Sequence, residues 1–188
     1  MEELIELDHK LFLYLNNLGS ETWDWMWIGI SDKWMAIPLY AFLLFLLFKK
    51  FGWKYSVATM VCIALLITCT DQMSNVFKDF FMRPRPCRQE GVTEFARIVA
   101  ERCGKYGFYS AHASSTFAVA IFLGSIFIKK IPKMIWFLLL WAAIVAYSRV
   151  YLGVHYPGDI LIGALFGILY GYLLYLLQQF VVKKLNVV

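Results

Sequence analysis

Long apolar segments separated by short polar ones make up most of the chain. A membrane core about 30 Å thick requires roughly 20 apolar residues in each spanning helix. Four segments meet this requirement well, and a fifth is shorter. They cover residues 34–48, 55–77, 110–128, 131–147 and 160–182. The pattern predicts an all-α fold, a polytopic membrane bundle of five transmembrane helices that forms a single domain over residues 1–188.

The first 20 residues have a different pattern, in which apolar side chains recur at helical spacing between charged ones. They are Leu4, Leu7, Leu11, Tyr14, Leu15 and Leu18. An amphipathic segment of this kind is typical of a helix that lies in the membrane interface. We therefore expect an interfacial helix over residues 1–20. The alternative is a sixth span built from residues 1–30.

The composition excludes an ordinary soluble domain. Hydrophobic residues make up 61% of the 188 residues and charged residues only 16%, against about 25% charged residues in typical soluble domains. A soluble domain of this length has too little interior to bury so much apolar surface. The net charge is +5, but the charges lie between apolar segments. We therefore expect membrane lipids as the surroundings and no nucleic-acid partner.

Lysines without acidic neighbours follow the first, third and fifth predicted spans, which places them on one side of the membrane. They are Lys49, Lys50, Lys54, Lys129, Lys130, Lys133, Lys183 and Lys184. The positive-inside rule makes this side cytoplasmic. The N-terminus, the loop over residues 82–110 and the link over residues 148–159 then face outside. We expect an integral protein of the plasma (inner) membrane.

Two cysteines, Cys87 and Cys103, lie in the predicted outer loop. In an oxidising compartment they can form a disulfide, and closing a ring of this length would contribute about 3 kcal/mol to stability. Two free thiols are the alternative. Their spacing matches no zinc motif, and no second pair is available to complete four ligands.

Three clusters of polar residues lie at the ends of the predicted spans, where ionisable groups are costly and suggest a function. They contain Lys78 and Arg85 after the second span, Ser110 and His112 at the start of the third, and Arg149, His155 and Asp159 between the fourth and the fifth. Arginines 83, 88, 97 and 102 of the outer loop could bind a second phosphate or could simply be solvated.

The predicted topology brings all three clusters to the outer surface, where they suit a phosphate dianion. Cations neutralise phosphate oxygens. A carboxylate that accepts from one imidazole nitrogen leaves the other free as a nucleophile or base, and a second histidine can protonate the leaving oxygen. Carboxylates are too few for a two-metal site. The residues predict phosphate chemistry without metal, but do not decide which histidine attacks.

The three clusters resemble the signature of the type 2 phosphatidic acid phosphatase (PAP2) superfamily, which reads K-x6-RP, PSGH and SR-x5-H-x3-D. The corresponding segments here are Lys78-x6-Arg85-Pro86, Tyr109-Ser110-Ala111-His112 and Ser148-Arg149-x5-His155-x3-Asp159. The first and third match fully. The second has Tyr109 in place of Pro and Ala111 in place of Gly, and it keeps the serine and the histidine.

This resemblance implies a role for each matching residue. His155 would be the nucleophile that forms a phosphohistidine, Asp159 would orient it, and His112 would protonate the leaving group and then activate water. The phosphate-binding groups would be Lys78, Arg85, Ser110, Arg149 and the backbone N–H groups near Ala111. No metal and no cofactor are implied.

The resemblance also implies a lipid phosphate as the substrate, bound at the outer headgroup level. Members of the family act on phosphatidic acid, phosphatidylglycerol phosphate, polyprenyl diphosphates and lipid A. An outward-facing site favours the last two, and undecaprenyl diphosphate is our first expectation. Two alternatives remain: a lipid phosphotransferase that uses the same residues, and a non-enzymatic anion transporter or scaffold.

Overall fold

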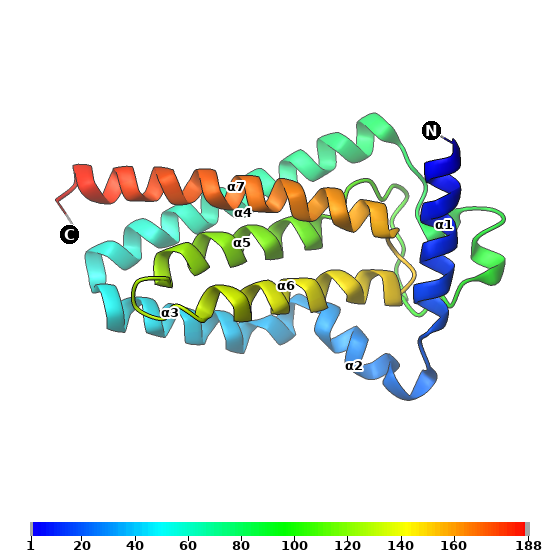
Figure 1. Ribbon diagram of the computed structural model, residues 1–188, viewed down its shortest axis with the longest axis horizontal. Helices are drawn as coiled ribbons and strands as arrows, with labels where there is room; N and C mark the ends of the chain where they lie inside the picture. Colours follow the sequence, from blue (N-terminus) through cyan, green and yellow to red (C-terminus); the bar gives the residue numbers. More distant parts are fainter. Residues whose placement is uncertain (1, 187–188) are drawn as a thin grey trace.

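The computed structural model describes residues 2–186, and these residues form an elongated helical bundle with a cap at one end (Figure 1). The α-helices are α1 (Glu2–Asn17), α2 (Glu21–Ser31), α3 (Ile37–Phe51), α4 (Trp53–Phe81), α5 (Ala111–Phe127), α6 (Met134–Tyr151) and α7 (Pro157–Lys184). Short 3-10 turns are η1 (Lys33–Ala36), η2 (Pro86–Arg88) and η3 (Thr93–Phe95). The described part of the chain contains no β-strand.

Helices α3 to α7 run along the long axis and confirm the predicted all-α membrane bundle. Four helical segments are long and apolar enough to cross a membrane, with η1 and α3 counted as one (Lys33–Phe51), and α5 is a shorter apolar helix of 17 residues. Large apolar side chains project from the outside of this bundle. Trp136, Leu140, Leu161 and Phe180 are each more than 60% exposed. Such a surface is stable only against lipid.

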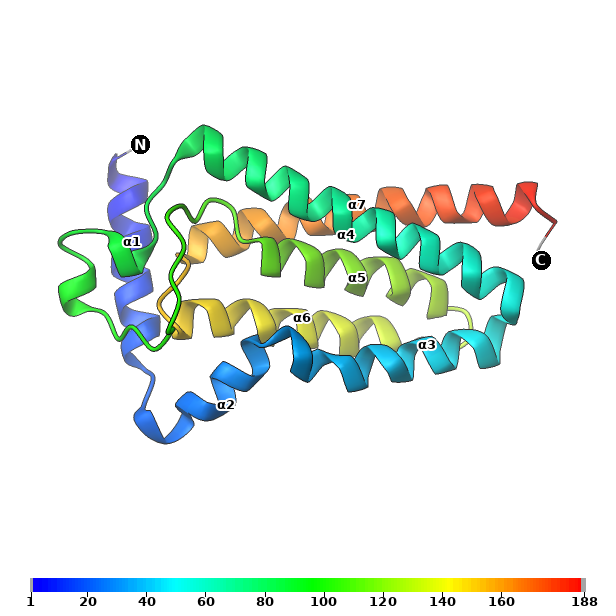
Figure 2. The ribbon, with the colours of Figure 1, turned by 180° about the vertical axis from the view of Figure 1, so that it is seen from behind.

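Helix α5 lies inside the bundle, packed against α4, α6 and α7 (Figure 2). From Phe117 to Gly124 its residues are apolar around the whole circumference, as expected for a helix that is covered on all sides. Glycines of α7 face the α5 backbone, and a Cβ atom on Gly163 would lie 2.7 Å from the carbonyl oxygen of Ser110. The glycines at positions 167 and 171 meet α5 in the same way. These three glycines therefore allow the close contact of α7 with α5.

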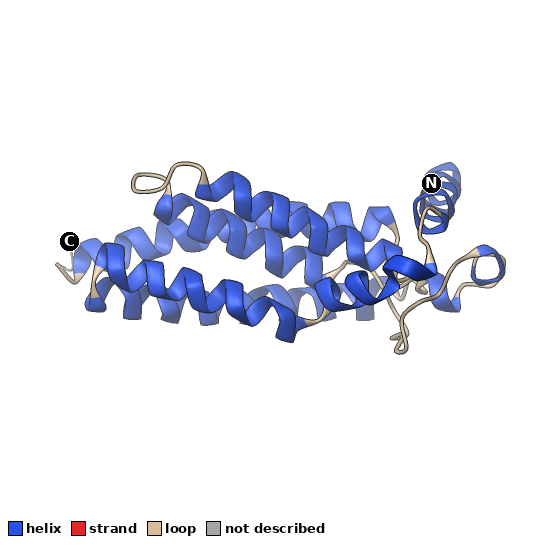
Figure 3. Cartoon of the chain, turned by 90° about the horizontal axis from the view of Figure 1, so that it is seen from below, coloured by secondary structure: helices blue, strands red, loops and turns tan. Residues whose placement is uncertain are grey.

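Helix α1 crosses the end of the bundle and is seen nearly end-on in Figure 3. Its outward residues include Leu4 and Leu7, which are 70% and 60% exposed, whereas Phe12 is fully buried. Asn16, also buried, donates from Nδ2 to the carbonyl oxygens of Val150 and Tyr151 at 3.0 and 2.9 Å. These carbonyls belong to the last turn of α6, where an α-helix provides no i+4 donors, and that of Val150 also accepts from the N–H of Gly153 at 3.0 Å. The amphipathic pattern thus corresponds to a helix that caps the bundle rather than to a sixth span.

The outer loop, residues 82–110, folds back on itself at the capped end. The structure joins Cys87 and Cys103 by a disulfide. The N–H of Gly107 donates to the carbonyl oxygen of Arg83 at 2.9 Å, and Pro84 forms an antiparallel bridge with Tyr106. Residues 83–88 therefore run beside residues 103–107. The segments that contain the predicted cytoplasmic lysines, residues 49–54, 129–133 and 183–184, lie at the opposite end of the bundle (Figure 1).

Candidate active site

The three clusters predicted from the sequence meet at the capped end of the bundle, where α4 ends, α5 begins and α6 connects to α7 (Figure 2). His112 lies within electrostatic range of Lys78, Arg85, Arg149 and His155. Gly107 provides a second common neighbour. A Cβ atom at Gly107 would lie 3.2 Å from Cγ of Arg85 and 3.6 Å from Nδ1 of His155. Residues separated by up to 77 positions thus surround one point.

The link between α6 and α7 places His155 beside Asp159. Gly153, with a φ of 77° that favours glycine, turns the chain at the end of α6, and the N–H of His155 donates to the carbonyl oxygen of Arg149 at 3.3 Å. Asp159 lies in the first turn of α7, where its Oδ2 accepts from the N–H of Tyr156 at 3.0 Å. The same Oδ2 lies 3.2 Å from Nδ1 of His155. The pair leaves Nε2 of His155 free.

His155 and Asp159 are both buried, at 2% and 0% exposure. Burial lowers the pKa of His155 to about 4, the neighbouring Asp159 opposes this shift, and the charges of Arg85 and Arg149 reinforce it. The imidazole is therefore neutral at pH 7. With Nδ1–H donating to the carboxylate, the lone pair of the imidazole is on Nε2. This arrangement suits a nucleophile or a base.

Among residues 2–186, the side chains of Lys78, Arg85 and Arg149 donate hydrogen bonds only to neutral oxygen atoms. Nζ of Lys78 donates to Oγ of Ser74 at 3.2 Å, and Nε of Arg85 donates to the carbonyl oxygen of Tyr106 at 2.9 Å. Burial also lowers the pKa of Arg85. The three cations form no ion pair within residues 2–186. Their positive charge is therefore available to an anionic ligand.

One partner of these cations comes from an element that the sequence did not associate with the site. Nη1 of Arg149 donates to Oγ of Ser31, the last residue of α2. Nζ of Lys78 also donates to Oδ1 of Asn75 at 3.4 Å, one helical turn earlier. A neutral partner orients a cation without cancelling its charge.

The first turn of α5 supplies backbone donors. Ser110 is the N-cap, and its Oγ accepts from the N–H of Ala113 at 3.4 Å. The N–H groups of Ala111 and His112 come first in the helix and have no intrahelical acceptor. A helix start of this kind attracts anions. The N–H of Ser110 donates to the carbonyl oxygen of Asp159 at 3.0 Å, which joins the starts of α5 and α7.

Tyr109, which stands where the family signature has Pro, is fully buried. Its ring stacks on Phe166 of α7, with the ring centres 5.0 Å apart, and meets Phe77 of α4 edge-on at 5.1 Å. Burial of a large aromatic ring contributes substantially to stability. The departure from the signature is thus explained by an aromatic contact among three helices directly beneath the site.

Arg83 and Asp8 also belong to this region. The sequence offered Arg83 only as one of four loop arginines for a second phosphate and gave Asp8 no role. Arg83 donates from Nη1 to Oδ1 of Asp159 at 3.0 Å and from Nη2 to Oδ2 of Asp8 at 2.6 Å. Arg97, another loop arginine, pairs with Asp24 at 3.1 Å. The repeated Arg-Pro dipeptide at 83–86 was the one available signal for Arg83. No signal in the sequence pointed to Asp8, because its contact with Arg83 joins residues 75 positions apart.

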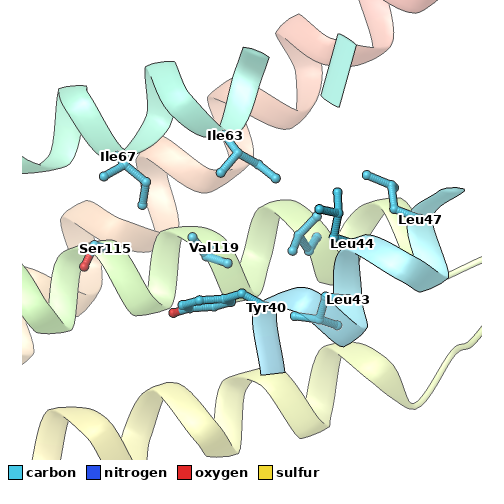
Figure 4. Close-up of a pocket in the computed structure, with 9 residues that line it drawn as sticks. Tyr40, Leu43, Leu44, Leu47, Ile63, Ile67, Ser115 and Val119 are labelled. Carbon is cyan, nitrogen blue, oxygen red and sulfur yellow. The ribbon is translucent and has the colours of Figure 1, made fainter. Parts of the chain in front are cut away.

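An apolar cavity of about 260 Å³ lies between α3, α4 and α5, below the site (Figure 4). Its lining residues are Tyr40, Leu43, Leu44, Leu47, Ile63, Ile67, Ser115, Val119 and Leu123. Ser115 follows His112 by three positions and therefore lies on the same face of α5, one turn further along. The cavity thus extends from the level of the site into the apolar part of the bundle.

Comparison with known proteins places these features in a family. The sequence profile of the PAP2 superfamily matches residues 53–183. A lipid A 4'-phosphatase of Bacteroides thetaiotaomicron is 38% identical, over 99% of this chain and 83% of the relative. A lipid A 4'-phosphatase of Porphyromonas gingivalis is 34% identical, over 93% and 74%. The crystal structure of a PAP2-type phosphatidylglycerolphosphate phosphatase from Bacillus subtilis has the same fold, with a TM-score of 0.71, 22% identity and coverage of 98% and 88%.

Proposed function

The chain belongs to the PAP2 superfamily and is a membrane phosphatase, and we propose that it removes a phosphate monoester from lipid A at the outer face of the inner membrane. Three cations without carboxylate partners, next to a neutral histidine held by Asp159, are the observation that carries this proposal. The sequence favoured undecaprenyl diphosphate over lipid A. The two relatives named as lipid A 4'-phosphatases, which match nearly the whole chain, reverse this preference.

The phosphate binds between the unpaired cations and the start of α5. Lys78 acts as a point charge, whereas Arg85 and Arg149 offer planar forks of donors that match phosphate oxygens. The N–H groups of Ala111 and His112 add neutral donors. A site of this kind compensates a dianion and also the charge that develops on the phosphoryl oxygens during transfer.

The reaction proceeds in two steps. First, Nε2 of His155 attacks phosphorus and the bond from phosphorus to the sugar oxygen breaks. His112, which takes up a proton when the phosphate dianion binds beside it, donates that proton to the sugar oxygen. Asp159 stabilises the positive charge that forms on the imidazole of His155. Second, His112, now neutral, takes a proton from water as the water attacks phosphorus. The P–N bond breaks, inorganic phosphate leaves, and His155 returns to its neutral form.

The apolar cavity between α3, α4 and α5 favours a lipid over a soluble phosphate ester. It begins one turn below His112 and is lined mainly by leucine and isoleucine side chains (Figure 4). We infer that it holds part of an acyl chain of the substrate while the phosphorylated headgroup lies among the cations. In a membrane, the phosphate of a lipid likewise lies at the surface and its acyl chain lies in the apolar core.

Two features support an outward-facing site. The lysines in the last turns of α3 and α7, at the start of α4 and between α5 and α6 lie at the end of the bundle opposite the site, and lysines are enriched on the cytoplasmic side. The loop at the site end contains the disulfide of Cys87 and Cys103, a bond that persists in oxidising compartments. A fluorescent protein fused after residue 188 is expected to fluoresce, because this end lies in the cytoplasm. A secreted reporter enzyme that is active at the same position would refute this orientation.

The decisive experiment incubates the purified protein in detergent with lipid A, undecaprenyl diphosphate or phosphatidylglycerol phosphate, each with a metal chelator present. We expect mass spectrometry to show loss of one phosphate group from lipid A and the highest kcat/KM for this substrate. His155→Ala is expected to be inactive. A higher kcat/KM for undecaprenyl diphosphate would overturn the substrate assignment, and activity only with added divalent metal would overturn the histidine mechanism.

A further inference from the structure

We propose that Asp8 of α1 and Arg83 of the outer loop are positioning residues for the phosphatase reaction, because together they hold Asp159 in the orientation in which it serves His155. The proposal rests on the function proposed above, since it assumes that His155 is the nucleophile. Neither Asp8 nor Arg83 occupies a specified position of the family signature. Both act through Asp159 rather than on the substrate.

The carboxylate of Asp159 has separate partners for its two oxygen atoms. Oδ2 faces Nδ1 of His155 at 3.2 Å and accepts from the N–H of Tyr156 at 3.0 Å. Oδ1 accepts from Nη1 of Arg83 at 3.0 Å. Asp159 is fully buried, so Oδ1 would have no water to replace Arg83. The arginine therefore determines the rotation of the carboxylate, and with it the direction in which Oδ2 points.

Two further groups, the carboxylate of Asp8 and the ring of Tyr156, contact the guanidinium of Arg83. Nη2 donates to Oδ2 of Asp8 at 2.6 Å, and the guanidinium lies over the ring of Tyr156, 4.2 Å from the ring centre. The other parts of that ring contact α1, where His9 stacks on it at 4.8 Å and Phe12 meets it edge-on at 5.3 Å. The guanidinium is thus fixed between α1 and the first residues of α7.

Asp8 determines how Arg83 binds Asp159. An arginine and a carboxylate favour a bidentate pair in which two nitrogens meet both oxygens. Here Asp8 occupies Nη2, so that Arg83 takes only Oδ1 of Asp159 and leaves Oδ2 to His155. Without Asp8, Arg83 is free to bind both oxygens and draw Oδ2 away from the histidine. Oδ1 of Asp8 also accepts from the N–H of Gly158 at 2.8 Å, which fixes Asp8 to the start of α7.

The chain offers a matched control in the pair of Arg97 and Asp24. Both pairs join an N-terminal helix to the outer loop, and both arginines lie near a tyrosine ring. Their side chains are similarly exposed, 21% and 14% for Arg83 and Asp8 against 25% and 23% for Arg97 and Asp24. The Arg97 pair contacts neither His155 nor Asp159 by any hydrogen bond among the described residues.

The test compares Asp8→Asn with Asp24→Asn in the full chain, with dioctanoyl phosphatidic acid as the probe substrate. Partners one step removed from a functional group typically contribute about 10- to 100-fold. We expect Asp8→Asn to lower kcat by about this factor with little change in KM, because the phosphate-binding cations are intact. Asp24→Asn is expected to keep its kcat within about twofold, as distant surface substitutions usually do.

Further variants separate positioning from folding. Arg83→Lys retains one donor and is expected to keep more activity than Arg83→Met. Gly158→Ala would place a Cβ atom 2.8 Å from Oδ2 of Asp8, so it displaces Asp8 without removing a charge and should lower kcat as Asp8→Asn does. In an Asp159→Asn background, Arg83→Lys is expected to cause no further loss, because residues that act through one another are not additive.

Equal kcat values for Asp8→Asn and Asp24→Asn would overturn the positioning role, as would a rise in KM at unchanged kcat. An additive loss in the Asp159→Asn background would show that Arg83 acts independently of Asp159, which also overturns it. These outcomes leave the proposed phosphatase mechanism intact. Activity that survives in His155→Ala would instead refute the nucleophile itself, and the positioning role with it.

Discussion

The cations at the capped end of the molecule fall into two groups that differ in their partners. Arg83 and Arg97 are each paired with aspartate. Lys78, Arg85 and Arg149 contact only hydroxyl, amide or carbonyl oxygens. A cation already neutralised by a carboxylate gains little from phosphate, whereas a partly buried cation with neutral partners is costly until an anion arrives. We therefore expect the second group to bind the substrate, and the first group to act through its ion pairs, Arg97 on the fold and Arg83 on Asp159.

The largest expected effect comes from removing a cation of the second group. Arg149→Met is expected to lower kcat/KM by about 10²- to 10³-fold, the usual result of losing one donor to a developing oxyanion. The substitution removes a partly buried charge without a carboxylate partner, so the thermal midpoint should not fall. Steady-state kinetics and a thermal melt in the same detergent check both parts. A large loss of stability at unchanged activity would place Arg149 in the first group.

Opening the disulfide is the next largest change. Cys87→Ser frees a loop whose closure contributes about 3 kcal/mol in the chain-entropy description. We expect the thermal midpoint of Cys87→Ser to fall. Activity should fall as well, because the loop places Arg85 beside Gly107 and the histidine pair. Denaturation of the wild type with and without reductant is the matching measurement, and equal midpoints would argue against this role of the loop.

A smaller effect is expected from the first group. Arg97→Met removes a partly exposed ion pair, for which about 1 kcal/mol is typical, while Asp24 keeps the hydroxyl of Tyr151 as a donor at 2.8 Å. The unfolding free energy should fall by about this amount and kcat/KM should stay within about twofold. A loss of activity as large as that of Arg149→Met would remove the distinction between the two groups.

The smallest effect concerns pH. The pKa of His155 is lowered to about 4, mainly by burial and further by Arg85 and Arg149, so the histidine stays neutral from neutral pH down to nearly this value. After correction for the second ionisation of the substrate, which lies near pH 6 for a phosphate monoester, kcat/KM should fall only as pH approaches 4. In Arg149→Met, the fall of kcat/KM on the acidic side should occur at a higher pH, because Arg149 no longer lowers the pKa of His155. An acidic limb at the ordinary histidine value in the wild type would contradict the burial of His155.

The same pKa shift has a consequence for stability. The unfolded chain binds a proton at His155 below the ordinary value of about 6.5, and the folded chain binds it only near 4. The contribution of neutral His155 to folding is therefore complete above pH 6.5 and is lost as pH falls from 6.5 towards 4. Chemical denaturation at several pH values measures this slope.

The sequence predicted the parts of the molecule that depend on local pattern. The hydrophobic segments correspond to α3 to α7, and the amphipathic start corresponds to α1. The boundaries were less accurate, because the predicted second span ended at residue 77 whereas α4 continues to Phe81. Lys78 and Asp79 interrupt the apolar run, but they do not interrupt the backbone hydrogen bonds, and the helix ends only at Met82, with a φ of 46°.

Contacts between residues that are far apart in the sequence could not be predicted from the sequence. Ser31 meets Arg149 over a separation of 118 positions, and Gly158 meets Asp8 over 150. Serine at the end of a helix and aspartate in an interfacial helix are common and carry no motif. Their importance depends on how α1 and α2 fold across the bundle, which is set by tertiary packing. The clusters with fixed spacing, in contrast, lie together in the structure.

The glycine face of α7 has one further consequence. His112 belongs to α5 and His155 immediately precedes α7, and these helices touch through their backbones at Gly163, where even a methyl group would collide with the carbonyl oxygen of Ser110. Main-chain contact therefore fixes the spacing of the two helix starts that carry these histidines, and a change of side chains elsewhere cannot readily alter it. A protein of this architecture that evolves towards a different lipid is expected to do so by remodelling the apolar cavity between α3, α4 and α5, with that spacing left as it is.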